Sequence, residues 1–169
     1  MMSAVNVQKL CESAQERLKT AVKRVETFLN EHALPQLAVD GNEESVLFYK
    51  GFLSDLRHVL VFSEVSYEKL GVALRRANFD VDFAEKALYN VYHDCVNSFF
   101  YPKNESYAED GRYAYTGQDA IRFRKTPVPA AREVIMDITK NFEELRDDLT
   151  YYESDYLTQR RMQTRRTHA

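Results

Sequence analysis

Residues 46–74, VLFYKGFLSDLRHVLVFSEVSYEKLGVAL, carry the most regular hydrophobic pattern of the chain. Their apolar side chains recur at alternating spacings of three and four residues, which is the period of one face of an α-helix. This stripe consists of Val46, Tyr49, Leu53, Leu56, Leu60, Ser63, Tyr67, Leu70 and Leu74, with the serine as its polar member. A second stripe beside it consists of Phe48, Phe52, Val59 and Phe62. So broad a face predicts a long helix with two or three packing neighbours, and Gly51 and Gly71 are expected to let another element approach closely.

Three other stretches show the same helical period. Together the four patterns predict helices over residues 3–33, 43–76, 80–100 and 129–162. Pro35 ends the first helix and Pro102 stops the third, because proline lacks the amide hydrogen that a helix interior requires. Pro129 suits the first turn of the fourth helix. Four long helices predict an all-α fold, an antiparallel four-helix bundle, and the length of 169 residues favours a single domain over 1–169.

Residues 101–128 interrupt this pattern between the third and fourth helices. With Pro129 included, this part of the chain holds three of the four prolines and two of the five glycines, which exclude a helix. Asp110-Gly111 is a turn signal, and segments 112–115 and 121–124 each alternate with a period of two. We therefore predict a β-hairpin-like insertion. Its bundle-facing side is expected to hold Tyr113, Tyr115, Ile121 and Phe123, and its outer side Arg112, Arg122 and Arg124.

The charge distribution is uneven along the chain. The formal net charge is −3, but residues 160–169 contain four arginines and no acidic residue. This basic tail could bind nucleic acid or anionic lipid. A frayed, solvated helix end with cations near the helix dipole is the simpler interpretation of so small a patch, so nucleic acid is disfavoured as a partner.

Features of secreted and membrane proteins do not appear in the sequence. The N-terminus has no signal-peptide pattern, and no run approaches the roughly 20 apolar residues of a membrane span. Cys11 and Cys95 each lie in a helical apolar stripe, where a buried, reduced thiol is expected. These features predict a cytoplasmic protein.

Motifs for catalysis and metal binding are also missing. The chain has no phosphate-binding loop, no Gly-x-Ser-x-Gly elbow, no Cys-x-x-Cys and no His-Glu-x-x-His. Asp55-x-x-His58 is the nearest match to a di-iron helix motif, and its histidine faces away from the main stripe. In His93-Asp94-Cys95, neighbours on a helix point about 100° apart and cannot close one tetrahedral site. We expect no metal and no cofactor, and the motifs favour a non-enzymatic protein.

Two sets of polar residues remain as site candidates. Glu64 lies at the edge of the main stripe, where a partly buried carboxylate needs a partner such as Arg57, His93 or a tyrosine hydroxyl. A polar network that sets helix register is the alternative to a catalytic carboxylate. The second set lies in the insertion and consists of Arg112, Tyr113, Tyr115, Arg122 and Arg124. These side chains suit an anion or nucleic acid, or they pair with acids such as Glu105, Glu109 and Asp110.

Four strings of the chain are similar to a known family. They are Arg57-His58-x-Leu60-x-Phe62-x-Glu64, Glu85-Lys86-x-Leu88-Tyr89-x-x-Tyr92-His93-x-Cys95, Ala114-Tyr115-Thr116-Gly117-x-x-Ala120-Ile121-x-Phe123 and Tyr151-Tyr152-Glu153-x-Asp155-Tyr156. In these strings the chain resembles the YpuI-like family of uncharacterised proteins of Bacillus-type bacteria, over nearly its whole length. The resemblance implies a bacterial cytoplasmic protein with no assigned activity and transfers no catalytic residue. It makes His58, Glu64, His93 and Tyr115 the first polar side chains to test.

Two functions are compatible with these observations. The first is a non-enzymatic structural or interaction protein that self-associates through an exposed part of helix 43–76 or through Tyr151, Tyr152 and Tyr156 near the end of the fourth helix. The alternative is a small-ligand or phosphate-binding protein, enzymes included, with its site where the insertion meets the bundle. The candidate residues there are Arg112, Tyr113, Tyr115, Arg122, Arg124, Glu64 and His93.

Overall fold

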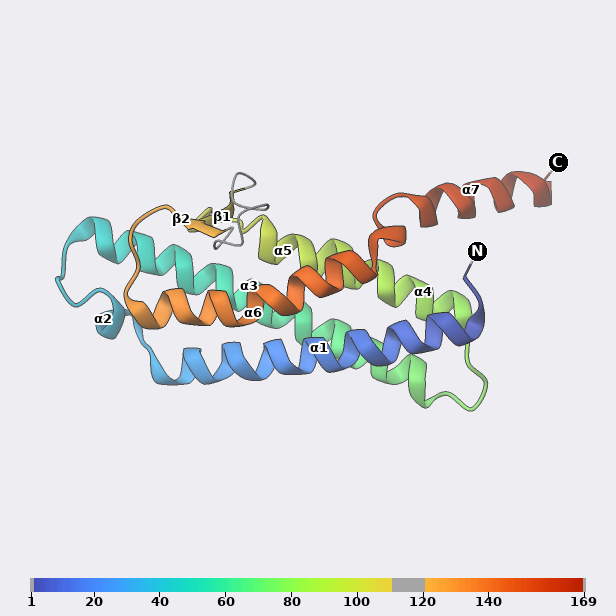
Figure 1. The fold of residues 1–169 in the computed structure, drawn as a ribbon, viewed down its shortest axis with the longest axis horizontal. Helices are drawn as coiled ribbons and strands as arrows, with labels where there is room; N and C mark the ends of the chain where they lie inside the picture. The colour runs from blue at the N-terminus through green and yellow to red at the C-terminus, as the bar shows by residue number, and fades with distance from the viewer. Residues whose placement is uncertain (1, 111–120, 169) are drawn as a thin grey trace.

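The computed structural model describes residues 2–110 and 121–168 and shows an elongated, mostly helical protein with a small antiparallel sheet (Figure 1). Its helices are α1 (Ala4–Glu31), α2 (Leu34–Leu37), α3 (Glu43–Arg75), α4 (Val81–Asn90), α5 (Asn97–Phe100), α6 (Pro129–Asp148) and α7 (Asp155–His168). A π-helical turn, η1 (Val91–Val96), joins α4 to α5, and a 3₁₀ turn, η3 (Thr150–Tyr152), follows α6. Within the described residues, no helix is both long enough and apolar enough to cross a membrane.

Side-chain caps begin the helices where the sequence predicts them. The Ser3 hydroxyl accepts a hydrogen bond from the backbone N–H of Asn6 at 3.3 Å, and α1 starts at the next residue. Asp80 caps α4 in the same way, through the N–H of Phe83 at 3.2 Å. Such caps satisfy amide groups that the first turn of a helix leaves without an internal partner.

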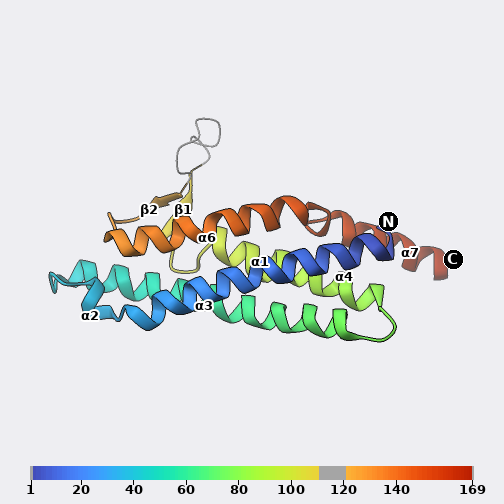
Figure 2. The same ribbon diagram turned by 60° about the horizontal axis from the view of Figure 1, so that its bottom comes forward.

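The core lies where α1, α3, α6 and the rod made of α4, η1 and α5 meet, with α1 packed against α3, α4 and α6 (Figures 1 and 2). Every member of the apolar stripe of α1 is buried: Val7, Cys11, Ala14, Leu18, Ala21, Val25 and Phe28. On α3 the most deeply buried side chains come from both predicted stripes and include Phe52, Leu56 and Val59. Phe62 is an exception, because it is 39 % exposed rather than part of the buried face.

The third predicted helix is present but contains an irregular turn. The N–H of Val91 reaches the carbonyls of both Ala87 and Leu88, and the backbone then follows the wider π-helical path of η1 to Val96. Such single π-turns change which side chains share a helix face. Cys95 and Tyr92 point into the core from this turn, while His93 is half-buried at its edge.

The fourth predicted helix, 129–162, is wrong as one continuous element. It ends at Asp148, and α7 begins only at Asp155 after the turn η3. The Thr150 hydroxyl donates to the carbonyls of Arg146 and Asp147, at 3.0 Å each, and so competes with the helical backbone pattern. Leu149 and Tyr152 both remain fully buried, whereas α7 is exposed from Thr158 to Arg166 and extends from the end of the molecule (Figure 1).

The two-stranded sheet confirms the predicted strand at 121–123 and pairs it with a segment that was not predicted as a strand. Strand β2 (Ile121–Phe123) pairs antiparallel with β1 (Tyr107–Glu109), with Tyr107 opposite Phe123 and Glu109 opposite Ile121. The predicted partner, 112–115, lies outside the described residues. Ile121 is buried and Arg122 is exposed, as the period of two predicts. Segment 107–109 takes the partner position because residues directly before it are bound to α3.

Candidate functional site

A buried carboxylate on α3, Asp55, holds the first part of the insertion. Its Oδ1 accepts the backbone N–H and the side-chain N–H of Asn104, both at 2.8 Å. Its Oδ2 accepts the Ser106 hydroxyl at 2.6 Å and the Ser106 N–H at 3.3 Å. Asp55 is 1 % exposed and Ser106 is completely buried. A buried carboxylate requires such donors, so Asp55 serves as an anchor and not as the metal ligand that its spacing to His58 suggested.

Glycine permits this close approach of the insertion to α3. A Cβ atom placed on Gly51 would lie 3.2 Å from the Cβ of Asn104, one helical turn before Asp55. At Gly71 a Cβ would lie 2.8 Å from the Arg75 guanidinium of the same helix and 3.1 Å from the side-chain nitrogen of Gln15, both of them ends of flexible side chains. The expectation of a close approach is therefore confirmed at Gly51.

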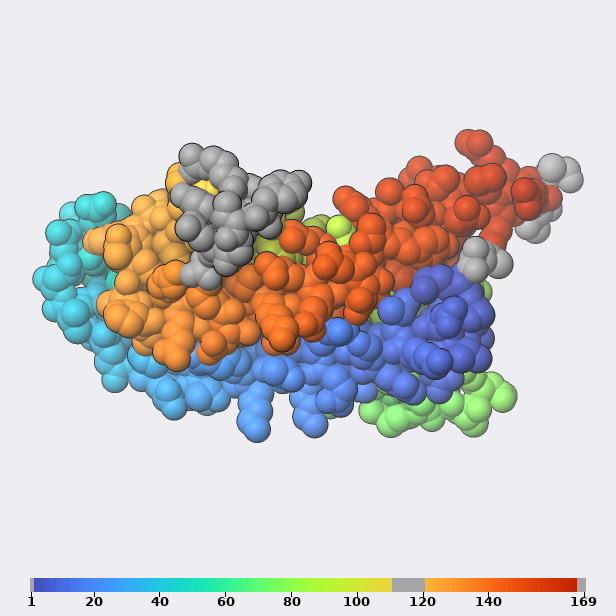
Figure 3. Space-filling view, viewed as in Figure 1, coloured from blue at the N-terminus to red at the C-terminus, as the bar shows by residue number. Residues whose placement is uncertain are grey.

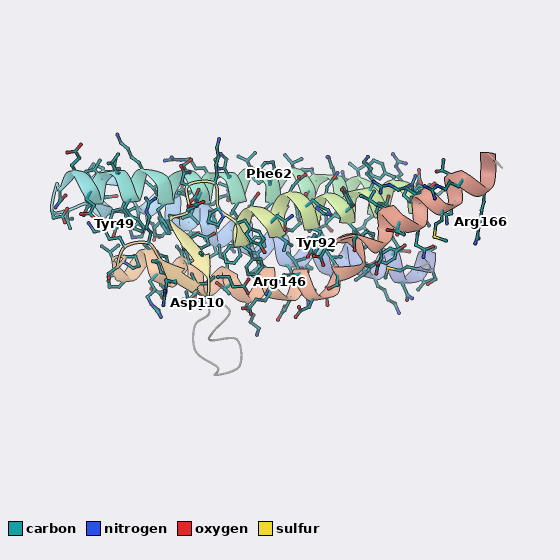
Figure 4. All side chains as sticks on the ribbon, turned by 90° about the horizontal axis from the view of Figure 1, so that it is seen from above. Tyr49, Phe62, Tyr92, Asp110, Arg146 and Arg166 are labelled. Carbon is teal, nitrogen blue, oxygen red and sulfur yellow. The ribbon has the colours of Figure 1, made fainter. Side chains whose placement is uncertain are left out.

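The sheet is also tied to α6. The two terminal nitrogens of the Arg146 guanidinium donate to the Glu109 carboxylate at 3.0 Å each, and the same guanidinium lies 3.9 Å from the centre of the Phe100 ring. At the other end of the insertion, the N–H of Val128 donates to the hydroxyl of Tyr49 at 2.8 Å, and Tyr49 lies between α3 and α6 (Figure 4). The insertion is thus held by two helices rather than by one.

The predicted arginines of the insertion have different surroundings. Arg122 is exposed on β2 and forms an ion pair with Asp110 at 3.2 Å, one of the acids expected to pair with these arginines. Arg124 donates to the carbonyl of Asn104 at 3.3 Å and lies 5.9 Å from the centre of the Phe48 ring. The other candidates, Arg112, Tyr113 and Tyr115, lie outside the described residues.

Glu64 has a carboxylate partner and not the cation or hydroxyl expected for it. It is exposed on α3 and lies beside the Glu26 carboxylate of α1. Partial burial and Glu26 together raise the pKa of Glu64 above its ordinary value. The two groups line a cavity of about 440 Å³ with Lys19, Val22, Lys23, Tyr67 and Glu68.

The Glu26–Glu64 pair predicts a pH-dependent stability. Because the pKa of Glu64 is raised on folding, its protonated form favours the folded state below the ordinary glutamate pKa, and this advantage is lost as the pH rises through the folded-state pKa. We therefore expect Glu64→Gln to be more stable than wild type at pH 7 and equal to it near pH 3. Urea unfolding at both pH values measures this difference. Glu68→Gln, which lines the same cavity, is the control, and an equal gain in that variant would contradict the assignment to the pair.

His93 belongs to another cluster, between η1 and η3. Its Nε2 is 2.9 Å from the carbonyl oxygen of Tyr152, and its ring is centred 4.2 Å from the Tyr89 ring. The Tyr152 hydroxyl donates to the buried Glu85 carboxylate at 3.0 Å. His93 and Glu64 thus have separate partners, and the structure does not bring them together in one site. Tyr152 and Tyr156 are buried in this cluster, so they do not offer the aromatic surface considered for association.

The thiol groups of Cys11 and Cys95 are buried and have a structural role. Burial raises the pKa of both Cys11 and Cys95 to about 12, which suppresses the reactive thiolate form. The Cys95 thiol contacts the carbonyl of Phe62 and the hydroxyl of Ser66, each at 3.3 Å. In residues 2–110 and 121–168, no three histidine, cysteine or acidic side chains gather in a way that could hold a metal ion.

The outer face of α3 carries an apolar patch. It consists of Leu47, Val61, Phe62, Val65 and Val72, which are 39–60 % exposed. Within the described part of the chain, only four other large apolar side chains are as exposed, and they are scattered over other segments: Val5, Val39, Tyr101 and Met162. We call the five α3 residues the outer α3 patch. All five belong to one helix, α3.

Reasoning from the sequence missed Asp55 as an anchor and missed most of this patch. Asp55 stands at the edge of a broad apolar face, which is the signal that a buried partner has to exist. In the sequence, the signal for the patch is a set of apolar residues on α3 that belong to neither predicted stripe, such as Leu47, Val61 and Val65.

The fold and the site define a mostly helical protein with an anchored two-stranded insertion and an apolar outer helix face. The chain belongs to the family described as "Protein of unknown function (DUF3907)", whose model matches residues 11–158. It is similar to the "Uncharacterized protein YpuI" of Bacillus subtilis (strain 168), with 34 % identity over 143 residues, which cover 82 % of this chain and 77 % of that protein. These findings confirm the resemblance to the YpuI-like family. No solved structure matches the chain.

Proposed function

We propose that the protein is a non-enzymatic, cytoplasmic interaction protein that self-associates through the outer α3 patch. In this proposal the chain forms a single domain, an antiparallel four-helix bundle made of α1, α3, the α4–α5 rod and α6. The packing of α1 against the other three supports the bundle. Cys11 and Cys95 are buried and free, which suits a reducing compartment. The outer α3 patch is the observation that carries the proposed association.

The spacing of the patch suits a second helix as its partner. Val61, Val65 and Val72 follow one another at intervals of four and seven residues, and Leu47 lies two heptads before Val61. These intervals keep side chains on one line along a helix that packs against another helix. The helix α3 has 33 residues and is about 50 Å long, which is enough for an extended seam.

Charge complementarity favours a second copy of the same helix in the antiparallel direction. Arg57 and Glu68 are exposed on the same flank of the patch, four residues before Val61 and three after Val65. In an antiparallel pair with its two-fold axis between Phe62 and Ser63, Arg57 of one copy lies beside Glu68 of the other, and the contact occurs twice. In a parallel pair, each charged residue of one copy would instead lie level, along the helix axis, with the same residue of the other copy.

Variants of the patch test this association. We expect the wild-type protein to be a dimer at micromolar concentration, and the double variant Val61→Glu, Val65→Glu to be a monomer, because four carboxylates would face one another across the seam. Light scattering coupled to size-exclusion chromatography measures the mass. Val39→Glu is the matched control, since Val39 is 78 % exposed but lies outside α3. A wild-type monomer at high concentration would reject the proposal.

A charge exchange tests the orientation of the pair. Arg57→Glu alone is expected to weaken the dimer, because it places acids beside Glu68 of the other copy. Adding Glu68→Arg to the same chain restores opposite charges and is expected to restore the dimer. If the two changes together weaken association further, the copies do not pack in the antiparallel direction.

A further inference from the structure

A second concave surface lies where the start of α3 meets the end of β2. It is an open cleft of about 630 Å³, lined by Glu44, Leu47, Phe48, Lys50, Gly51, Asn104, Arg124 and Lys125. Its volume falls within the range of small-molecule sites. The space-filling view shows the first turns of α3 and the segment leading into α6 at the same end of the molecule, away from α7 (Figure 3).

Three cations from two separate segments surround this cleft. Lys50 belongs to α3, and Arg124 and Lys125 directly follow β2, whereas Glu44 is the one acid among the lining residues. The amino group of Lys125 donates to the Ser45 hydroxyl, which in turn donates to Asp40 at 3.0 Å. The contacts of Arg124 with the Asn104 carbonyl and the Phe48 ring position its guanidinium group.

The cleft combines this positive charge with an apolar wall. A guanidinium group carries five N–H donors in a planar fork that matches phosphate oxygens, and the Asn104 carbonyl engages one of them. Leu47, which is 60 % exposed, provides apolar surface on the same cleft, whereas the Phe48 ring beside Arg124 is buried. An anion without an organic body would leave this surface in water.

We propose that the cleft binds a small organic phosphate, with its phosphoryl group between Arg124, Lys125 and Lys50 and its apolar body against Leu47. The geometry favours a small molecule over nucleic acid. The cations gather in one cleft instead of forming a stripe, and the chain carries a net charge of −3, which repels a polyanion. This inference does not rest on self-association, and Leu47 belongs both to this cleft and to the outer α3 patch.

Calorimetric titration at constant ionic strength tests the proposal with three probes: phenyl phosphate, inorganic phosphate and phenol. We expect phenyl phosphate to bind most tightly, inorganic phosphate more weakly, and phenol not measurably. Arg124→Gln is expected to weaken phenyl phosphate binding about tenfold, because it removes a charged hydrogen-bond donor. Lys50→Gln is expected to act in the same direction. Both side chains are exposed, and urea unfolding verifies that the variants remain folded.

Arg122→Gln is the matched control on the same strand. Arg122 does not line this cleft and is paired with Asp110, so its removal is expected to leave binding unchanged. An equal loss in Arg122→Gln and Arg124→Gln would indicate diffuse attraction and overturn the site. Absence of saturable heat with phenyl phosphate would also overturn it. Tighter binding of a single-stranded oligonucleotide than of phenyl phosphate would replace the small-molecule assignment.

Discussion

Replacing Asp55 with alanine is expected to lower the free energy of unfolding by about 3 kcal/mol or more, because four hydrogen bonds to a buried carboxylate are lost together. The variant leaves the Ser106 hydroxyl and N–H buried without their acceptor. Breaking such a network costs more than removing an exposed ion pair, since water cannot replace the missing partner. Urea unfolding followed by circular dichroism measures the change.

Two further readouts separate anchoring from general destabilisation. Amide hydrogen exchange of Asn104 and Ser106 is expected to become faster in Asp55→Ala than exchange in α1. Asp55→Asn keeps one acceptor oxygen but presents an N–H₂ group to the other donors, so an intermediate loss is expected. Ser54→Ala, on the adjacent and less buried position, is the control and should change stability by less than about 0.5 kcal/mol. If Asp55→Ala exchanges like wild type at Asn104 and Ser106, other contacts hold the insertion.

Replacing Phe99 with alanine is expected to cost about 4 kcal/mol of stability, because it opens a cavity at the junction of the helices and the sheet. The Phe99 side chain is fully buried and stacks on Phe142 of α6 with ring centres 4.7 Å apart. Its ring also lies 5.6 Å from that of Tyr107 on β1. One side chain therefore connects α5, α6 and the insertion.

Tyr101→Ala provides a nearby comparison for this variant. Tyr101 lies two residues further along the chain and is 75 % exposed, so little apolar contact is lost on truncation. We expect its free energy of unfolding to stay within about 0.5 kcal/mol of the wild-type value. Thermal and urea unfolding of both variants give the comparison. Equal losses for Phe99→Ala and Tyr101→Ala would show that the aromatic junction is not a centre of stability.

The helices could be predicted well from the sequence, because the cap that begins a helix and the apolar spacing that marks its buried side both involve residues close in sequence. Ser3 and Asp80 cap the helices that follow them, and the spacing of apolar residues identifies the buried side of α1. The same rules failed at Asp148. There the apolar period continues through Leu149, Tyr152 and Tyr156, but α6 ends and Tyr152 is buried with its hydroxyl on the Glu85 carboxylate.

The candidate site was predicted less well than the fold. Glu64 was expected to meet a cation or a hydroxyl, yet α1 places Glu26 beside it. Asp55 looked like half of a weak metal motif, yet its partners come from residues 104 and 106 of the insertion. These pairings join positions about 40 to 50 residues apart, and no periodic pattern encodes which side chains meet across such a distance.

The amino-acid sequence alone specified the helical class, the limits of α1 and α3, the non-helical insertion and the family resemblance, because periodicity, caps and prolines act within a few residues. Tertiary packing decided which segment pairs with β2, where α6 ends, and which apolar side chains of α3 remain in water. The physical reason is that burial is a property of neighbours. An apolar residue such as Val61 or Phe62 is part of the core or of the outer α3 patch according to whether another helix covers it.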